Sequence, residues 1–291
     1  MTPRVHDDSW TWRLCAVLFL VFPALAVAQE STNAVAGGAT NSAPVASSFS
    51  RFLSPYEPIY FLVGTYPAAE FQLSLKYEIF APTNRWARPF TNFYLAYTQT
   101  SFWDLLSSDP SFYDTSYKPS AFVSIPDILL GRNERPCQID LQAGIEHESN
   151  GRGGAGERSL YTAYLQPTFS FGQPQRLQLS LSPRAWVYVI GLSQNNPDMA
   201  DYRGYADLSG TLSWKLKGQE NNQAFKLRTA FGLGDNGSHS SLKIDLSFSV
   251  LQWCRWFTPR IHVQYFTGYG QTLRQYNASS HGLRAGISLY D

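Results

Sequence analysis

Apolar and polar residues alternate along most of this chain. In the clearest stretch, apolar side chains at even positions from 242 to 250 alternate with polar side chains at odd positions from 241 to 249. A period of two is that of a β-strand with one apolar and one polar face. Twelve such segments occur, near residues 58–66, 70–80, 90–103, 118–126, 137–149, 159–171, 176–190, 203–217, 223–233, 239–251, 257–268 and 281–290.

An even number of strands of this length is typical of an antiparallel barrel, in which every backbone group is paired and no edge is left. A soluble β-sandwich also alternates. The sandwich fits less well, because charged residues recur on the polar faces and aromatic residues gather at strand ends, as they do at a membrane surface. The pattern therefore predicts an all-β fold, a twelve-stranded antiparallel transmembrane β-barrel.

The N-terminus has the features of an export signal. Arg4 and Arg13 precede an uncharged run over 14–27, and Ala26-Val27-Ala28 fits a small-x-small cleavage site. The run is only about 14 residues long, too short for a spanning helix. We expect a signal peptide over 1–28, a flexible tether of small, turn-favouring residues over 29–56, and the barrel domain over 57–291. These features predict localisation in the outer membrane of a Gram-negative bacterium.

Composition narrows the classes of partner. Aromatic residues make up 15% of the chain and charged residues also 15%, against roughly 25% charged in ordinary globular proteins. The net charge is +1, so an electrostatic case for nucleic-acid binding is lacking. Cys137 and Cys254 are the cysteines outside the expected signal peptide, and they either form a disulfide or remain separate thiols.

One strand combines the alternation with reactive side chains. In "QIDLQAGIEHESNGRGGAG", residues 138–156, the apolar side chains occupy odd positions. Continuing that count puts His147 and Ser149 on the apolar face, which looks at lipid in a membrane barrel. Polar groups facing hydrocarbon are costly and mark a functional site. A serine needs a base to act as a nucleophile, and histidine, with an ordinary pKa near 6.5, is suited to that role.

At this strand the chain resembles the bacterial outer membrane phospholipase A family, whose active strand carries the motif H-x-S-N-G-R. Here the motif reads "HESNGR", residues 147–152. Further blocks resemble the family in the same order along the chain: "FQLSL" (71–75), "YTQTSFW" (97–103), "TSYKP" (115–119), "SLYT" (159–162), "NPDMADYRGY" (196–205) and "TGYGQTLRQYN" (267–277).

The resemblance implies calcium-dependent hydrolysis of phospholipid acyl esters, with phospholipase A1 and A2 activity and action on lysophospholipids. It implies a serine hydrolase site on the outside of the barrel. Ser149 would be the nucleophile, His147 the general base, and the backbone N–H of Gly151 would help to hold the oxyanion.

The resemblance also implies Ca²⁺ as cofactor and a calcium-linked homodimer. Arg152 would bind the metal through its backbone carbonyl, and Glu157 would replace a serine ligand of the family. The ligand from the second subunit would be Asp109 or its neighbour Ser108. Asn195 stands where the family has an aspartate of a weaker calcium site, which we expect to bind feebly here.

Two departures keep alternatives open. The family has an asparagine on the following strand that orients the histidine, whereas the segment "ERSLYT" (157–162) is shorter and contains no asparagine. Either Glu157 or a residue brought in by a shifted register replaces it, or the histidine is held less firmly. Glu157 cannot easily fill both roles, and we favour the metal role for it. A catalytically inactive or structural barrel is the alternative function. A passive channel is a further alternative, but bulky charges of both signs in the lumen would form ion pairs that block a pore.

Overall fold

The computed structural model describes residues 52–80, 92–128, 137–192, 196–215, 223–249 and 259–290. The expected signal peptide and most of the expected tether lie outside these residues, as do Asn195 and Cys254. Cys137 is a free thiol of intermediate exposure. No helix in the described residues is both long and apolar enough to cross a membrane.

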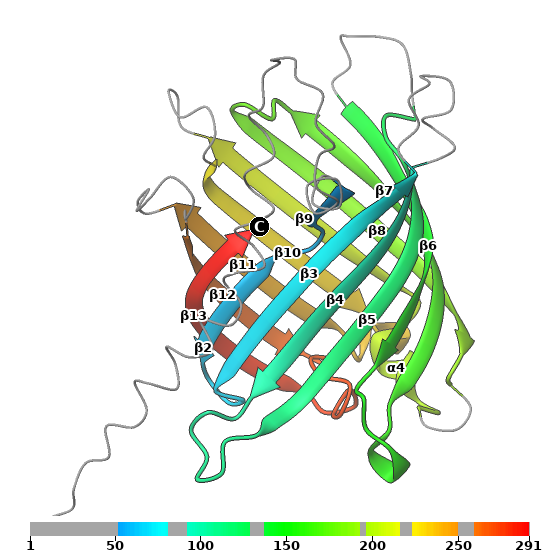
Figure 1. The fold of residues 1–291 in the computed structure, drawn as a ribbon, viewed down its shortest axis with the longest axis vertical. Helices are drawn as coiled ribbons and strands as arrows, with labels where there is room; N and C mark the ends of the chain where they lie inside the picture. Colours follow the sequence, from blue (N-terminus) through cyan, green and yellow to red (C-terminus); the bar gives the residue numbers. More distant parts are fainter. Residues whose placement is uncertain are drawn as a thin grey trace, which may run out of the picture. The chain divides into compact units, whose positions relative to one another are not determined.

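Twelve antiparallel strands form a closed barrel (Figure 1). Each strand pairs with its neighbours in the sequence, and pairing of β13 with β2 closes the ring. The short strand β1 (Leu53–Pro55) precedes the barrel strands in the sequence. The barrel strands are β2 (Ile59–Gly64), β3 (Ala69–Phe80), β4 (Phe93–Trp103), β5 (Phe112–Ile125), β6 (Cys137–Ser149), β7 (Ser159–Gly172), β8 (Leu177–Ile190), β9 (Ala206–Lys215), β10 (Gln223–Leu233), β11 (Ser241–Ser249), β12 (Arg260–Gly268) and β13 (Ser280–Tyr290).

The predicted fold class is confirmed, and each of the twelve predicted segments overlaps one strand of the barrel. The largest difference in boundaries is at β5, which begins at Phe112 and not near residue 118. The strand begins early because its ladder with β4 continues to the pair Trp103 and Phe112. Backbone pairing across a long hairpin extends this strand beyond the segment in which its own residues alternate.

The barrel is apolar outside and polar inside. Large apolar side chains are exposed on the outer face, among them Ile145 (61%) and Leu283 (55%), while Glu70 and Arg284 are only 3% and 1% exposed. This reverses the arrangement of a water-soluble protein. A barrel of this kind satisfies its backbone internally and presents its apolar face to lipid.

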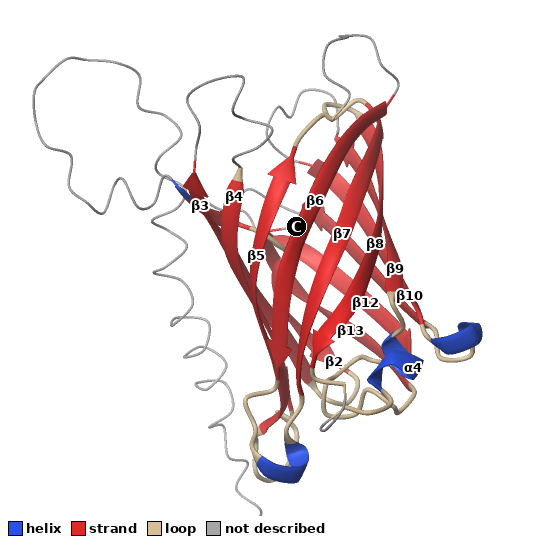
Figure 2. Cartoon of the chain, turned by 90° about the vertical axis from the view of Figure 1, so that its right-hand side faces the viewer, coloured by secondary structure: helices blue, strands red, loops and turns tan. Residues whose placement is uncertain are grey.

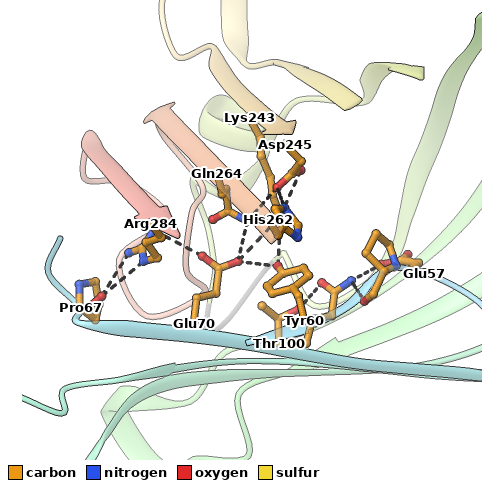
Figure 3. A network of polar contacts seen from close by, with 12 residues as sticks. Glu57, Tyr60, Pro67, Glu70, Thr100, Lys243, Asp245, His262, Gln264 and Arg284 are labelled. Carbon is orange, nitrogen blue, oxygen red and sulfur yellow. Dashed lines mark hydrogen bonds and ion pairs between the residues drawn. The ribbon is translucent and has the colours of Figure 1, made fainter. Parts of the chain in front are cut away.

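A network of charged and polar side chains joins the strands around the closing seam (Figure 3). Glu70 on β3 lies at its centre: Tyr60 Oη donates a hydrogen bond to Glu70 Oε1 at 2.6 Å, and Arg284 Nη1 lies 3.4 Å from Glu70 Oε2. Lys243 Nζ lies 3.8 Å from Glu70 Oε1. Asp245 accepts a hydrogen bond from Gln264 Nε2 at 3.0 Å. The network therefore links β2 and β3 to β11, β12 and β13.

Other charges of the interior are paired in the same way. Arg184 Nη2 lies 3.2 Å from Glu146 Oε1, and the Arg184 guanidinium stacks over the Tyr164 ring at 4.0 Å. A polar cavity of about 510 Å³ remains in the interior, lined by residues that include Lys118, Arg184 and Lys243. The expected pairing of lumen charges of opposite sign is present among the described residues.

Replacing Arg284 by methionine is expected to lower the free energy of unfolding by about 3 kcal/mol, because it removes the nearer of two cations beside the buried Glu70 carboxylate and leaves Lys243, at 3.8 Å, to balance its charge. The urea midpoint of folding in detergent micelles measures this change. Arg176→Met, at an exposed turn residue, is the control and should leave the midpoint unchanged. The double variant Glu70→Gln/Arg284→Met should regain part of the loss. A wild-type midpoint for Arg284→Met would contradict this role of the network.

Candidate active site

The two faces of β6 separate its charges from its candidate catalytic residues. Glu146 and Glu148 point into the barrel, where Glu146 pairs with Arg184 and Glu148 is 4% exposed. Ile145 points outward and is 61% exposed. Because side chains alternate along a strand, His147 and Ser149 lie on the same outer face as Ile145. The structure thus brings both residues to the lipid-facing surface at the end of the strand.

His147 is enclosed by its neighbours on this face. It lies directly opposite Tyr161 of β7, and the centroids of the two rings are 4.4 Å apart, with 40° between the ring planes. His147 Nδ1 is buried and has no hydrogen-bond partner among the described residues. Ser149 lies opposite Tyr117 on β5 and Ser159 on β7. In the described structure no hydrogen bond joins Ser149 to His147, and such contacts commonly tighten only when substrate is bound.

The loop that follows Ser149 is organised by Asn150. Its Oδ1 accepts hydrogen bonds from the backbone N–H groups of Arg152 (3.2 Å) and Arg158 (3.1 Å). Its Nδ2 donates to the Gly156 carbonyl at 2.9 Å. One side chain, 5% exposed, therefore satisfies three backbone groups of the loop.

Gly151 follows in a conformation that favours glycine. Its φ is +65°, in the left-handed region. A Cβ at this position would lie 2.9 Å from the Tyr117 ring. Both constraints disfavour a side chain at this position, two residues after Ser149.

The candidate calcium ligands lie on two neighbouring loops. Arg152 and Glu157 belong to the loop after β6, which contains the short 3-10 helix η2 (Gly154–Gly156). Ser108 and Asp109 are exposed on the loop between β4 and β5, at the same end of the barrel. Arg152 Nη2 donates to the Tyr113 carbonyl at 2.9 Å, which ties the first loop to β5. Within the described residues, no three His, Cys, Asp or Glu side chains form a metal-binding group.

Beneath the outer face, Glu148 anchors the strand from inside. It accepts hydrogen bonds from Ser116 Oγ and Arg203 Nη1, each at 2.6 Å, and Lys118 Nζ lies 3.6 Å away. Arg203 comes from α4 (Met199–Arg203), which lies at this end of the barrel (Figure 2). Burial alone would lower the pKa of Arg203, but the Glu148 carboxylate outweighs it and raises that pKa above its ordinary value.

Two further loops brace the start of β7. Asn196 Nδ2 donates to the Ser159 and Gly191 carbonyls, each at 2.8 Å. A buried cluster joins the loops to the strand through Leu160, Met199, Leu273 and Tyr276. Tyr276 Oη donates to Asp198 Oδ1. Burial and this hydrogen bond raise the pKa of Tyr276 to about 12, so the phenol stays protonated and keeps the contact.

Sequence reasoning did not identify Asn150, Tyr161 or Arg203 as parts of the site. The alternation indicated that Glu148 faces inward, but its partner Arg203 lies 55 residues away along the chain. The resemblance marked the segment 196–205 without giving it a role. The neighbour of His147 on β7 depends on the register of the hairpin. The sequence pattern predicts which face a residue is on, but it does not predict which residue of that face lies opposite His147.

Replacing Asn150 by alanine is expected to open the loop, because it leaves three backbone groups without partners at a cost of about 2 kcal/mol. Trypsin cleavage of the refolded protein after Arg152 and Arg158, followed by mass spectrometry, should then be about tenfold faster or more. Asn277→Ala, at an exposed asparagine of another loop at this end, should cleave at the wild-type rate. Equal rates for Asn150→Ala and wild type would show that Asn150 does not hold the loop.

Comparison with known proteins now identifies the family. The family model described as phospholipase A1 matches residues 67–289. The phospholipase A1 of Salmonella typhimurium is 29% identical over 208 residues, which cover 67% of this chain and 61% of that protein. The phospholipase A1 of Escherichia coli K12 is 28% identical over 208 residues, which cover 67% of this chain and 61% of that protein. The chain spans about half to three fifths of the length of the curated relatives that it matches.

Solved structures support the same fold. Outer membrane phospholipase A from Escherichia coli superimposes with a TM-score of 0.65 at 23% identity, covering 82% of this chain and 98% of that one. A Salmonella typhi outer membrane phospholipase, solved as a dimer with bound calcium, gives the same TM-score and identity and covers 82% of this chain and 92% of its own. The matched family model extends over most of the barrel, and the chain therefore belongs to the phospholipase A1 family.

Proposed function

We propose that this protein is an outer membrane phospholipase that hydrolyses acyl esters of phospholipids, at either glycerol position and in lysophospholipids. Ser149 and His147 would carry the reaction. The observation that carries the proposal is the position of both side chains on the apolar outer face of β6. Ester bonds of membrane lipids lie at the boundary between acyl chains and headgroups, and a site at the end of a lipid-facing strand has access to them.

In the proposed reaction, Ser149 Oγ attacks the acyl carbonyl carbon while His147 accepts the hydroxyl proton. The same proton then goes to the leaving oxygen of the glycerol, which departs as a lysophospholipid or a deacylated product. Water, activated by His147, hydrolyses the acyl-enzyme and releases the fatty acid. The backbone N–H of Gly151 would donate to the oxyanion, a role favoured by its position in the loop directly after Ser149.

The loop after β6 would also supply oxygen ligands to a calcium ion. Calcium prefers carboxylate and carbonyl oxygens. Arg152 offers its backbone carbonyl and Glu157 its carboxylate, and both lie on the loop that Asn150 holds by hydrogen bonds. Among the described residues, the Glu157 carboxylate makes no ion pair. When bound, the ion would act as a Lewis acid that stabilises negative charge at the acyl oxygen. Asn195 would contribute at most to a weaker second site.

A calcium-linked homodimer belongs to the same proposal. Its support is the dimer with bound calcium in the Salmonella typhi structure. Ser108 or Asp109 of a second copy would add a further oxygen ligand, because both are exposed at the end of the barrel where the metal loop lies. The segment over 1–28 would direct export to the outer membrane and be removed.

A catalytically inactive barrel is the second candidate function. One observation favours it, the buried Nδ1 of His147 without a hydrogen-bond partner in the described structure. A general base is usually oriented through the ring nitrogen that does not react. The activity of the wild-type protein separates the two candidates.

Ser149→Ala is expected to reduce calcium-dependent release of fatty acid from mixed micelles by at least about a thousandfold, because it removes the nucleophile. Ser159→Ala is the matched control, since Ser159 lies directly opposite Ser149 in the ladder, and should retain most of the activity. His147→Ala should resemble Ser149→Ala. Wild-type rates for Ser149→Ala would refute the proposed mechanism, and a wild-type protein without activity would support the inactive barrel.

Glu157→Gln is expected to weaken calcium binding about tenfold or more, because it removes a charged oxygen ligand. Calorimetric titration of the refolded protein with calcium measures this change, with the calcium dependence of activity beside it. Asp235→Asn, at an exposed acid of another loop at the same end, should bind as the wild type does. Unchanged calcium affinity in Glu157→Gln would remove Glu157 from the ligand set.

A further inference from the structure

Tyr161 is the aromatic neighbour of His147 on the outer face. The register of β6 and β7 places the two residues directly opposite, between the pairs Ile145 with Ala163 and Ser149 with Ser159. Tyr161 is therefore flanked on β7 by small side chains. The ring centroids are 4.4 Å apart, within the range in which aromatic rings pack with favourable dispersion and quadrupole contacts.

Within the described part of the chain, no hydrogen bond joins His147 to β5, the other neighbouring strand. Pairs on either side of it set the register of β5 and β6, Tyr117 with Ser149 and Ser120 with Glu146. Counting between them brings Pro119 opposite His147. A proline side chain carries no donor or acceptor, and its backbone lacks an N–H. By register His147 thus stands between Pro119 of β5 and Tyr161 of β7, and the printed ring contact is with Tyr161.

The imidazole nitrogens are in unequal surroundings. Nδ1 is buried without a partner among the described residues, and Nε2 is left as the nitrogen that can meet a serine hydroxyl. An unpaired buried nitrogen does not define the direction of the ring, since no hydrogen bond fixes it. Orientation of the ring must then come from packing, and Tyr161 is the contact that the described structure provides.

From these contacts we infer that Tyr161 is a positioning residue, which holds His147 by ring packing where a hydrogen-bonded amide or carboxylate would otherwise hold it. The inference rests on the proposed role of His147 as general base. The tyrosine ring restricts rotation of the imidazole about χ1 and χ2, so that Nε2 stays directed along the outer face toward Ser149. The phenol hydroxyl plays no part in this contact.

The inference requires that the ring and not the hydroxyl be essential. Tyr161→Phe keeps the ring and should keep kcat within about twofold of wild type. Tyr161→Ala removes the ring and should lower kcat about tenfold or more while KM changes little, because binding of lipid is retained and only the base is misplaced. An equal loss in both variants, or no loss in Tyr161→Ala, overturns the inference.

A second pair of variants tests the unpaired nitrogen. Tyr161→Asn and Tyr161→Leu have side chains of similar length, but the asparagine offers an amide oxygen to an Nδ1–H donor directly across the ladder. Tyr161→Asn should exceed Tyr161→Leu in kcat by about tenfold, since the amide orients the imidazole and the leucine cannot. Equal kcat in the two variants contradicts the view that orientation of His147 limits the rate.

A chemical readout separates this inference from the proposed activity. Diethylpyrocarbonate modifies accessible imidazoles, and mass spectrometry of the refolded protein reports the extent at His147. Tyr161→Ala should raise the rate at His147 several-fold over wild type and Tyr161→Phe, with His281, exposed at the barrel end, as the internal reference. If the wild type lacks phospholipase activity but shows this pattern, the proposed function fails and the ring contact stands. If the modification rates are equal in all three proteins, the ring contact fails.

Discussion

The ion pair of Glu148 with Arg203 determines which way the active strand faces. Residue 148 lies between His147 and Ser149, so an inward Glu148 obliges both neighbours to point outward. The carboxylate is held inside by a guanidinium, a hydroxyl and an ammonium group. Slipping β6 by one residue would expose this charge to lipid and bring the imidazole into the lumen. Such a slip would also separate the Glu148 carboxylate from its three partners, and breaking a buried ion pair costs about 3–5 kcal/mol. The register is therefore strongly specified where the site lies.

The same pair couples the loops to the strand. Arg203 ends α4, and the buried cluster around Met199 and Tyr276 seats α4 against the loop that precedes β13. Asn196 fastens the same segment to the Ser159 carbonyl, opposite Ser149. The outer face of the site is made by β6 and its two neighbouring strands, and loops at the end of the barrel hold these strands in place. Precise placement of reacting groups depends on such supporting contacts.

Most of the fold could be predicted from the sequence, because a barrel strand has to alternate in order to satisfy lumen and lipid at once. The outward positions of His147 and Ser149 followed from the same alternation. The start of β5 could not, since it depends on pairing with β4 across a hairpin. Arg203 could not be matched to Glu148, nor Asn150 to its three backbone partners, because these contacts arise from the way loops fold over the barrel end. Asn195 and Cys254 lie outside the described residues, and their predicted roles stay predictions.

The identity of the residue beside His147 depends on the register of the hairpin formed by β6 and β7. Leu160 and Tyr164 of β7 are buried inside, whereas Tyr161 is 45% exposed outside. An outward histidine can face only an outward residue, so the candidates on β7 near the loop are Ser159, Tyr161 and Ala163. The loop over 150–158, closed by Asn150, selects Tyr161 among these three. A one-residue shift of β7 against β6 would oppose an inward side chain to His147 and is excluded by the faces of the barrel. A shift of two residues would place the hydroxyl of Ser159 or the methyl group of Ala163 opposite His147 in place of the Tyr161 ring. The register of the β6–β7 hairpin thus controls the surroundings of the base as directly as the amino acid on β7 does.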